Sequence, residues 1–430
     1  MTPTKVLFFL HNHPSIRPGG SESYALELYE SMRSSPDFDP TLVARLGPDV
    51  ATDRKAHTDA PFSTVNSDPK QYFFFTEEAH FDFVFMTLRE KARYTSHFAN
   101  FLRAQNPDVV HFQHTYFYGI DFLTLTRSVL PDVPIVYTLH EFLPICNRDG
   151  QMLRTNGELC LEASPRRCNE CFPDVPPQHF FLRERFAKAH LEKVDVFLAP
   201  SRFLMERYVD WGIPREKIRF EDYGRGPQPR LPGGDAPRPR NRLGYFGQAN
   251  PFKGHQVLLR AMAMLRHERP DIHLWLNAAN FSLQKPYWKE EFPQLLEAAG
   301  DSVTFAGAYD HASVPRRMAQ VDWVIVPSLW WENSPLVIQE AFMHGRPVIC
   351  SNIGGMAEKV THGVNGLHFA VADPVSLAQV IRDAVDTPGL WDQLRAGMPD
   401  VYTMEQHMAS LRQLYAELIG LRSPQAALAS

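Results

Sequence analysis

The sequence has no long apolar run and no block of charge of one sign. No stretch approaches the roughly eighteen apolar residues that a membrane-spanning helix needs. The 44 Lys and Arg residues are slightly outnumbered by 49 Asp and Glu, and no basic run could track phosphates, so we expect no nucleic-acid binding. The opening MTPTKVLFFLHNHP lacks a small-residue cleavage site and is typical of a buried strand. We therefore expect a cytoplasmic protein without a transmembrane segment, for which contact with the inner face of a membrane stays open.

Cysteine is scarce, and its few residues are clustered. Four of the five lie in one short segment: Cys146, Cys160, Cys168 and Cys171. Without an export signal, a metal site is favoured there over disulfides, although only the last pair has the short spacing of half a zinc site. We expect a structural zinc that fixes a loop insertion at about 141–178, with His179 as a reserve ligand. Unlinked thiols, disulfides or another metal are the alternatives.

The length predicts two domains, because 430 residues exceed what one hydrophobic core usually supports. In the first half, short apolar runs alternate with helical stretches. The expected strands are VLFFL at 6–10, DVVHF at 108–112, PIVYTLH at 134–140 and VDVFLAP at 194–200. Runs of this length are typical of strands buried on both faces of a parallel sheet, so we expect an α/β domain.

A Pro- and Gly-rich stretch separates the two halves. YGRGPQPRLPGGDAPRPRN at 223–241 cannot sustain a helix or a strand, so we place the domain boundary near residue 230. The predicted domains are 1–230 and 231–403. Residues 404–430 are expected to form a helix that packs back on the first domain, followed by a tail.

The second half repeats the alternation of strands and helices. Its expected strands are 243–247, 272–277, 303–307, 323–328 and 347–351, and its expected helices are 254–268, 313–320, 335–344, 374–386 and 404–420. This pattern predicts a second doubly wound parallel sheet. Ligands bind outside the carboxyl ends of such strands, so we expect two Rossmann-like domains that face a cleft.

Two strand-to-helix loops contain residues suited to a diphosphate. Gly19 and Gly20 precede a helix after the first strand, and glycines let the backbone approach a ligand at a helix N-terminus. The loop after the strand at 243–247 contains Gly247, Lys253 and a further glycine. A lysine beside a helix start adds positive charge to an anion site. The alternatives are a simple tight turn for the first loop and a solvated surface lysine for the second.

The block VPSLWWENSPLVIQEAFMHGRPVICSNIGGMAEKVTHGVNGLHF is the most informative part of the chain. Glu332 follows a strand, and Glu340 lies on the helix that comes next. The apolar residues that surround Glu340 along this helix make a solvated helix face a poor explanation. The two carboxylates are therefore candidates to bind hydroxyls of a sugar and of a ribose.

The segment from Pro327 to Phe369 resembles the signature of glycosyltransferase family 4, whose members are retaining enzymes with the GT-B fold. The similarity extends over nearly the whole chain, because the glycine loop and the Lys253 loop fall where the family has them. The resemblance implies transfer of a sugar, of the hexosyl type, from a nucleotide-diphosphate donor to a hydroxyl of a glycan, a lipid-linked sugar or a small molecule. It implies a role in glycan biosynthesis and no cofactor for catalysis.

The family's functional residues map onto positions of this sequence. The resemblance implies that Lys253 binds the donor diphosphate, Glu332 contacts the donor sugar, and Glu340 holds the ribose. Gly20 would lie by the distal phosphate, and His140 beside the transferred sugar. The catalytic candidates are His140, Glu332 and Lys253; the donor-binding set is Gly19, Gly20, Gly247, Gln248, Lys253, Glu332, Asn333, Ser334, Pro335, Leu336 and Glu340.

One position departs from the family pattern. Gln248 stands where many members have an arginine, so the site has lost a fixed positive charge. Lys253 and helix N-termini are then left to stabilise the leaving diphosphate, with Arg225 as a substitute cation.

Other functions fit parts of the same pattern. A sugar-nucleotide epimerase would share the architecture and the donor but need no acceptor. A non-catalytic homologue would keep the fold and bind a partner protein. A dehydrogenase is disfavoured, because no G-x-G-x-x-G follows either opening strand.

Overall fold

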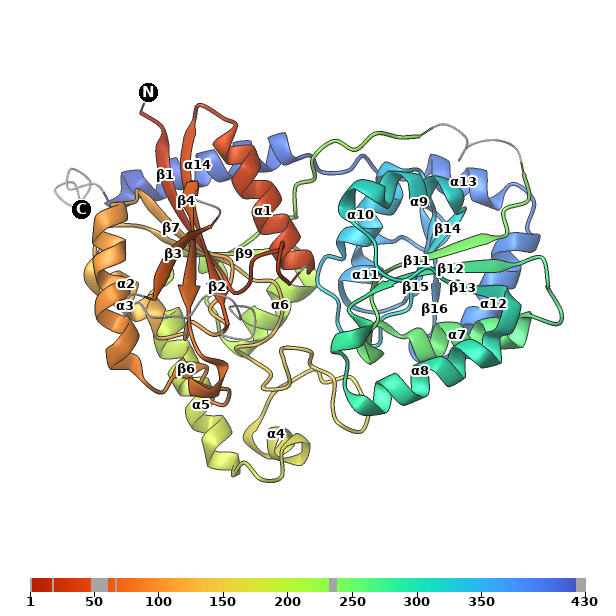
Figure 1. Cartoon of the computed structure of the whole chain (residues 1–430), viewed down its shortest axis with the longest axis horizontal. Helices are drawn as coiled ribbons and strands as arrows, with labels where there is room; N and C mark the ends of the chain where they lie inside the picture. Colours follow the sequence, from red (N-terminus) through yellow and green to blue (C-terminus); the bar gives the residue numbers. More distant parts are fainter. Residues whose placement is uncertain (1, 18, 48–60, 66–67, 232–237, 423–430) are drawn as a thin grey trace. The chain divides into compact units, whose positions relative to one another are not determined.

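The chain forms two compact α/β units (Figure 1). In the computed structural model, residues 2–17, 19–47, 61–65, 68–231 and 238–422 are described. One unit consists of Met1–Gly226 and Tyr402–Ser430, and the other of Pro227–Val401, limits that lie near the expected 230 and 403. Part of the predicted linker, 232–237, and the predicted tail, 423–430, lie outside the described residues.

The first unit is built on a mostly parallel sheet of eight strands. Among the described residues, the order of these strands is β10-β9-β8-β7-β1-β2-β4-β3; the β3–β4 pair is antiparallel and the other pairs are parallel. The strands are β1 (Thr4–Leu10), β2 (Phe38–Leu46), β3 (Phe62–Val65), β4 (Asp68–Phe75), β7 (Val109–Phe112), β8 (Ile135–Thr138), β9 (Val196–Ala199) and β10 (Ile218–Phe220). All four strands expected in this half are confirmed.

Helices cover both faces of this sheet (Figure 1). They are α1 (Gly20–Arg33), α2 (Lys91–Gln105), α3 (Phe122–Val129), α4 (Pro165–Cys171), α5 (Pro177–Leu191) and α6 (Arg202–Trp211), beside a two-stranded ribbon of β5 (Phe81–Asp82) and β6 (Thr87–Leu88). Successive side chains of β1 point to opposite faces. Phe9 packs on Phe98 of α2, with ring centroids 5.0 Å apart, whereas Phe8 packs on His111 of β7. Both faces of the strand are therefore buried, as its apolar sequence predicts.

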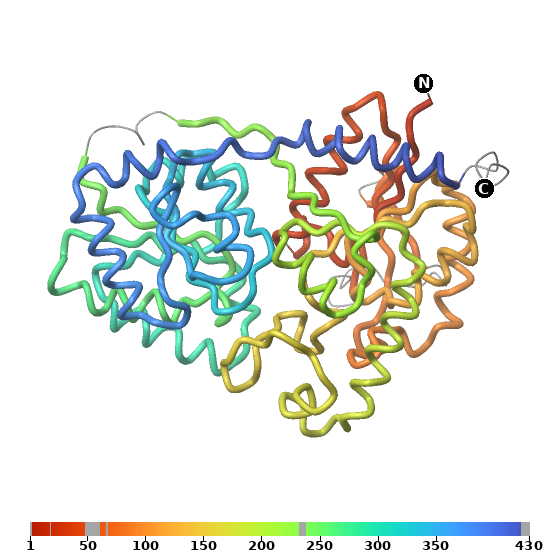
Figure 2. The backbone as a smooth tube through the Cα atoms, turned by 180° about the vertical axis from the view of Figure 1, so that it is seen from behind, coloured from red at the N-terminus to blue at the C-terminus, as the bar shows by residue number. Residues whose placement is uncertain are grey.

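The last helix of the chain, α14 (Met404–Arg422), belongs to the first unit. Figure 2 shows it, in blue, beside the red N-terminal segment. The Tyr415 hydroxyl lies 2.7 Å from His111 Nδ1, and His407 Nε2 lies 2.7 Å from the Tyr24 hydroxyl. These buried polar contacts fix the helix against the sheet and α1, where the sequence analysis expected it.

The second unit has six parallel strands in the order β13-β12-β11-β14-β15-β16. They are β11 (Arg242–Gln248), β12 (His273–Ala279), β13 (Val303–Phe305), β14 (Trp323–Val326), β15 (Val348–Ser351) and β16 (Gly366–Phe369). The helices are α7 (His255–Leu265), α8 (Pro286–Ala299), α9 (Val314–Gln320), α10 (Leu336–Met343), α11 (Gly354–Lys359), α12 (Pro374–Asp386) and α13 (Leu390–Ala396). Every strand and helix expected in this half is present, so the prediction of a second doubly wound sheet is confirmed.

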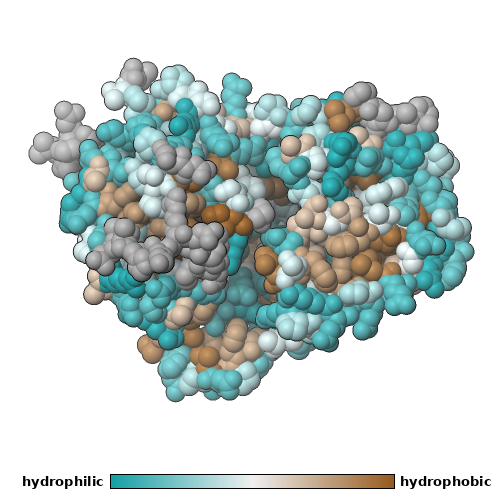
Figure 3. Space-filling model, viewed as in Figure 1, coloured by the Kyte–Doolittle hydropathy of each residue, from teal (hydrophilic) through white to brown (hydrophobic). Residues whose placement is uncertain are grey.

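The face seen in Figure 3 is mostly hydrophilic, with scattered hydrophobic patches. One patch lies at the lower end of the view. Phe181 and Leu182 are exposed on α5. Among the described residues, no helix is long and apolar enough to cross a membrane.

Candidate active site

The loop after β11 holds Lys253 in a defined position. The side chain of Asn250 accepts hydrogen bonds from the backbone N–H groups of Phe252 and Lys253, and so forms a short turn before α7. Gly254 follows with φ of 76°, and a Cβ there would come within 1.7 Å of the Pro327 carbonyl oxygen. Only glycine lets this loop pack against the end of β14, which brings Lys253 to the loop that contains Glu332.

Lys253 and Glu332 form an ion pair at the carboxyl ends of two adjacent strands. Lys253 Nζ lies 2.6 Å from Glu332 Oε1, and the same oxygen accepts hydrogen bonds from Ser328 Oγ at 2.6 Å and Trp330 Nε1 at 3.0 Å. The Lys253 ammonium also lies 5.4 Å from the Trp330 ring centroid. Glu332 is only 6% exposed, so its charge depends on these donors. Within the described part of the chain, no group donates to Oε2.

Gly355 supports the loop that contains Glu332. Gly355 N–H donates to the Glu332 carbonyl at 2.8 Å, and a Cβ on Gly355 would lie 1.4 Å from the Asn333 carbonyl oxygen. The start of α11 therefore packs directly under the backbone of residues 332–333. Asn333 and Ser334 are buried, and Pro335 is the N-cap of α10, so the positive end of that helix dipole lies at this loop.

Glu340 lies in a different set of contacts from Lys253. It is 8% exposed, and its Oε1 lies 3.9 Å from His311 Nδ1. The charge of Glu340 contributes to the pKa of Tyr309, which burial raises far above its usual range. His311 in turn lies 3.1 Å from Gln228. Glu340 thus faces the loop after β13, separate from the diphosphate candidates.

Gly247 and Gln248 end β11. The Tyr245 hydroxyl donates to the Gln248 carbonyl at 2.9 Å, and a Cβ on Gly247 would lie 2.7 Å from that hydroxyl. Asn250 Nδ2 donates to Gln248 Oε1 at 3.3 Å. The Gln248 amide therefore helps to shape the turn that leads to Lys253.

Arg225 does not replace the missing cation, which corrects the sequence-based expectation. Its side chain is buried in the first unit, where Nη1 lies 3.0 Å from Glu27 on α1. Its backbone forms a parallel bridge with Thr403 and hydrogen bonds with the segment that leads into α14. The guanidinium therefore pairs with a carboxylate of the first unit.

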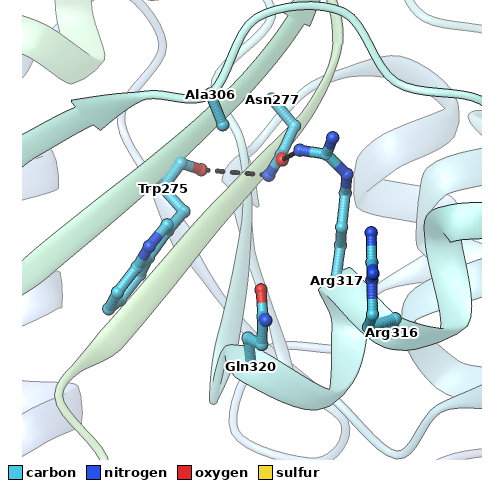
Figure 4. A pocket seen from close by; sticks show the side chains of 6 residues that line it. All are labelled: Trp275, Asn277, Ala306, Arg316, Arg317 and Gln320. Carbon is cyan, nitrogen blue, oxygen red and sulfur yellow. Dashed lines mark hydrogen bonds between the residues drawn. The ribbon is translucent and has the colours of Figure 1, made fainter.

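A separate cavity in the second unit lies between β12 and α9 (Figure 4). It is lined by Trp275, Asn277, Ala306, Arg316, Arg317 and Gln320. Arg317 donates to the Asn277 side chain, whose amide donates in turn to the Trp275 carbonyl. Because Arg317 is already engaged and none of the predicted site residues lines this cavity, we assign no role to it.

The glycine loop of the first unit contains a buried carboxylate. Gly19 is the N-cap of α1, Gly20 is its first residue, and a Cβ on Gly19 would lie 2.4 Å from Glu22 Oε2. Glu22 Oε1 lies 2.9 Å from His11 Nε2, and Ser21 Oγ donates to Oε2 at 2.8 Å. Burial acts to raise the pKa of Glu22, but His11 and these hydrogen bonds lower it to about 2. The carboxylate is therefore ionised and holds the loop in place.

His140 lies just beyond the end of β8 with both ring nitrogens engaged. Nε2 lies 2.9 Å from Gln113 Oε1, and Nδ1 lies 2.5 Å from the Tyr223 hydroxyl. Because Gln113 Oε1 only accepts, Nε2 donates to it, and in a neutral imidazole Nδ1 then accepts from the Tyr223 hydroxyl. Burial lowers the pKa of His140 well below its usual range. His140 is thus a neutral, oriented group.

The sequence analysis missed a histidine and glutamate cluster beside His140. His11 and His114 have ring centroids 4.3 Å apart, and His114 Nε2 lies 3.2 Å from Glu141 Oε1. These residues follow β1, β7 and β8, which are neighbours in the sheet. The signal was available, because HNH directly follows the expected strand at 6–10, and HFQH and LHE span the ends of the expected strands at 108–112 and 134–140.

The four clustered cysteines lie on the loop that follows His140, and all are free thiols. Burial raises the pKa of Cys168 to about 11 and that of Cys146 above its usual range. His179, the reserve ligand, lies on α5 near the Phe85 ring. In the part of the chain that is described, no group of three or more His, Cys, Asp or Glu side chains is placed so that it could hold a metal ion.

Two family models match the chain, one in each unit. The model described as Glycosyltransferase Family 4 matches residues 18–220, and the model described as Glycosyl transferases group 1 matches residues 240–387. Together they cover the glycine loop, His140, Lys253, Glu332 and Glu340.

Curated relatives and solved structures agree with this match. The D-inositol 3-phosphate glycosyltransferase of Streptomyces coelicolor is 28% identical over 223 residues, or 45% of this chain and 48% of that enzyme, so the match spans about half of the relative. Sucrose-phosphate synthase from Thermosynechococcus elongatus has a TM-score of 0.67 at 18% identity, covering 97% of this chain and 99% of that chain. Anabaena HepE in complex with UDP-glucose has a TM-score of 0.62 at 17% identity, covering 98% of this chain and 99% of that chain. The chain thus contains a Glycosyltransferase Family 4 domain and a Glycosyl transferases group 1 domain, and its two α/β units are those of the GT-B fold.

Proposed function

We propose that the protein transfers a sugar from a nucleoside-diphosphate donor to a hydroxyl acceptor and retains the anomeric configuration. The observation that carries the proposal is the Lys253–Glu332 pair, in which a lysine beside a helix start lies 2.6 Å from a buried carboxylate. A cation suits the diphosphate, and a carboxylate suits the hydroxyls of the sugar next to it.

Lys253 and Glu332 bind different parts of the donor. The Lys253 ammonium and the N-terminus of α10 stabilise the charge that develops on the leaving diphosphate. Glu332 Oε1 already accepts three hydrogen bonds, so Oε2 is the oxygen that accepts from the sugar. This division explains why Ser328 and Trp330 hold the carboxylate on one side only.

We propose that the anomeric configuration is retained because the acceptor attacks the anomeric carbon from the face on which the diphosphate leaves. The acceptor oxygen bonds to the anomeric carbon as the bond from that carbon to the phosphate oxygen breaks, and the acceptor proton passes to the departing phosphate. Because His140 is neutral, it brings no positive charge to the site. We therefore assign it to hydrogen bonding and orientation. Catalysis then consists of positioning and electrostatic stabilisation of an oxocarbenium-like state.

The donor is proposed to be a hexose nucleotide, with UDP-glucose as the first one to test, because the structural neighbour HepE is in complex with it. The acceptor class includes a cyclitol phosphate, by analogy with the Streptomyces coelicolor relative, a sugar and a lipid-linked sugar. We further propose that Glu340 holds the ribose and that the enzyme acts in the cytoplasm, with its acceptor at the inner face of a membrane if that acceptor is a lipid.

The test is NMR of the product formed from an α-linked donor. The purified protein is incubated with UDP-glucose and a pool of sugar, cyclitol and lipid-linked acceptors, and the coupling constant of the new anomeric proton is measured. An α-linked product supports retention, and a β-linked product contradicts it. Conversion of the donor sugar without an acceptor would instead support an epimerase.

A further inference from the structure

A series of buried polar side chains connects His140 to the last helix of the chain. His140 Nε2 lies 2.9 Å from Gln113 Oε1, and Gln113 Nε2 lies 3.3 Å from His111 Nε2. His111 Nδ1 lies 2.7 Å from the hydroxyl of Tyr415 on α14. Gln113 and His111 are fully buried, and Tyr415 is nearly so. These groups therefore depend on one another for their hydrogen bonds.

The hydrogen bonds of this series run in one direction. An amide nitrogen only donates, so His111 Nε2 accepts from Gln113. Burial lowers the pKa of His111 to about 3, and in the neutral ring Nδ1 then carries the proton and donates to the Tyr415 hydroxyl. The Gln113 amide thus turns its oxygen toward His140, and this oxygen only accepts. His140 is therefore held with its proton on Nε2.

A reversed Gln113 amide would exchange every donor and acceptor in the series. Its nitrogen would donate to His140 Nε2, and the proton of His140 would move to Nδ1. Its oxygen would accept from His111 only if that ring carried its proton on Nε2. The tautomers of the two histidines are therefore coupled through the Gln113 amide.

The last helix also supports the other ring nitrogen of His140. The Tyr223 hydroxyl lies 2.5 Å from His140 Nδ1, and the rings of Tyr223 and Tyr24 pack with centroids 4.3 Å apart. The Tyr24 hydroxyl lies 2.7 Å from Nε2 of His407 on α14. Both sides of the His140 ring thus lead to residues of α14.

We propose that α14 sets the tautomer of His140. Tyr415 keeps the proton of His111 on Nδ1, and Gln113 passes this choice on to His140 Nε2. Which nitrogen of a histidine is protonated depends on the hydrogen bonds of the ring, so the network gives His140 one fixed pattern of donor and acceptor. Tyr415, His111 and Gln113 are then positioning residues for the sugar transfer proposed above, and this role rests on that function.

NMR of the full-length protein tests the tautomer without any substrate. Selective labelling of the histidine nitrogens gives spectra in which a protonated ring nitrogen differs from an unprotonated one. His140→Gln and His111→Gln identify the two rings by the loss of their signals. We expect His140 to be protonated on Nε2 and His111 on Nδ1. The opposite pattern in either ring would overturn the proposal.

Tyr415→Phe tests the role of α14. It removes the acceptor of the His111 Nδ1 proton, whereas Gln113 and Thr138 both lie at Nε2. A buried N–H without an acceptor is unfavourable, so a form with the proton on His111 Nε2 should appear. Through the Gln113 amide, a form of His140 with the proton on Nδ1 should appear with it. An unchanged His140 pattern would refute the role of α14.

Two further variants separate this effect from a general loss of stability. Tyr118→Phe is the matched control, because Tyr118 is also fully buried and its hydroxyl donates to backbone carbonyls of β1 and β2. The His140 pattern should not change in it, and an equal change in both tyrosine variants would contradict the proposal. Gln113→Glu keeps an oxygen that accepts from His140 Nε2 and should preserve the pattern. Gln113→Leu should lose it, and a single pattern retained in Gln113→Leu would also refute the coupling.

Kinetics connect the network to the proposed transfer. We expect kcat of Tyr415→Phe to fall about 3- to 10-fold, as for the loss of one hydrogen bond, with the Kd of the donor within about twofold. Equal kcat in Tyr415→Phe and Tyr118→Phe, despite a changed His140 tautomer, would show that these residues do not position His140 for transfer. If the unaltered protein transfers no sugar, the proposed function fails, whereas the NMR spectra still decide whether α14 sets the tautomer.

Discussion

Lys253 Nζ lies 2.6 Å from Glu332 Oε1, although the two residues are far apart in sequence. The pair forms because β11 and β14 are adjacent in the sheet and each ends in a loop on the same side. In the proposed function, a donor diphosphate adds a second anion beside this lysine, so Lys253 would contact both the diphosphate and Glu332. This relationship makes Lys253 and Glu332 the two positions whose replacement is most informative.

Replacement of Lys253 by alanine is expected to weaken donor binding. Loss of one charge-assisted hydrogen bond costs about 1.5–3 kcal/mol, so we expect the Kd of the donor to rise about 10- to 100-fold. Calorimetry measures the change, with Lys289→Ala on the exposed surface of α8 as the matched control. Equal donor affinity in the two variants would show that Lys253 does not bind the diphosphate.

Glu332→Gln is expected to lower kcat more than donor affinity. The amide keeps the shape but removes the charge that stabilises the transition state, so we expect kcat to fall about 100- to 1,000-fold. Steady-state kinetics with saturating donor give the value, and Glu290→Gln on α8 controls for loss of a surface charge. Turnover within about twofold of the unaltered enzyme would exclude a catalytic role for this carboxylate.

Glu22→Gln is expected to destabilise the first unit. The native pKa of about 2 lies below the usual 4.5, so the unfolded state binds more protons between these values. This contribution to the free energy of unfolding is therefore present above about pH 4.5 and is lost as the pH falls toward about 2. We expect the variant to lose about 1–3 kcal/mol at pH 7, by chemical denaturation. Glu30→Gln, exposed on the same helix, should lose almost nothing, and an equal loss there would contradict the argument.

His255 predicts acid sensitivity of the second unit. Burial lowers its pKa from 6.5 to about 3, so the unfolded state binds a proton that the native state does not. His255 then has no effect on the free energy of unfolding above about pH 6.5, and below that pH the free energy of unfolding falls by up to about 1.4 kcal/mol per pH unit. Denaturation at pH 7 and pH 5 measures this slope. We expect a shallower slope in His255→Gln than in the control His267→Gln, and identical slopes would refute the assignment.

Gly355→Ala is expected to disturb the Glu332 loop. The new Cβ would lie 1.4 Å from a carbonyl oxygen, so the backbone must move, at a cost of at least about 2 kcal/mol. Gly420→Ala on α14 is the control, because a Cβ there meets nothing within 4 Å. Melting temperatures of the two variants give the comparison, and similar values would contradict the close packing.

Much of the fold follows from patterns that lie within single segments. β1, β7, β11 and β14 are short apolar runs, and α12 begins at a proline after Asp373, so both kinds of element are predictable from local sequence. Strand β16 was missed because Gly366–Phe369 contains one glycine and one histidine among four residues. It is a strand because it pairs with β15, which local sequence does not reveal.

The site was predictable only in part for a related reason. Lys253, Glu332 and His140 occupy positions that the family resemblance identifies, and the structure shows their contacts. The pairing of His114 with Glu141 depends on which strands are neighbours in the sheet, and that of Glu22 with His11 depends on the conformation of the loop between β1 and α1. Arg225 was misjudged because a linker arginine gives no sign in the sequence that Glu27 on α1 will bury it.

The central claim is that Lys253 and Glu332 form a nucleotide-sugar donor site. Titration calorimetry of the unaltered protein and of Lys253→Ala against UDP-, GDP-, ADP- and TDP-sugars tests it most directly. We predict that at least one donor binds the unaltered protein and binds Lys253→Ala about tenfold or more weakly. Failure of every donor to bind, or equal affinity of both proteins for the donor that does, would contradict the claim.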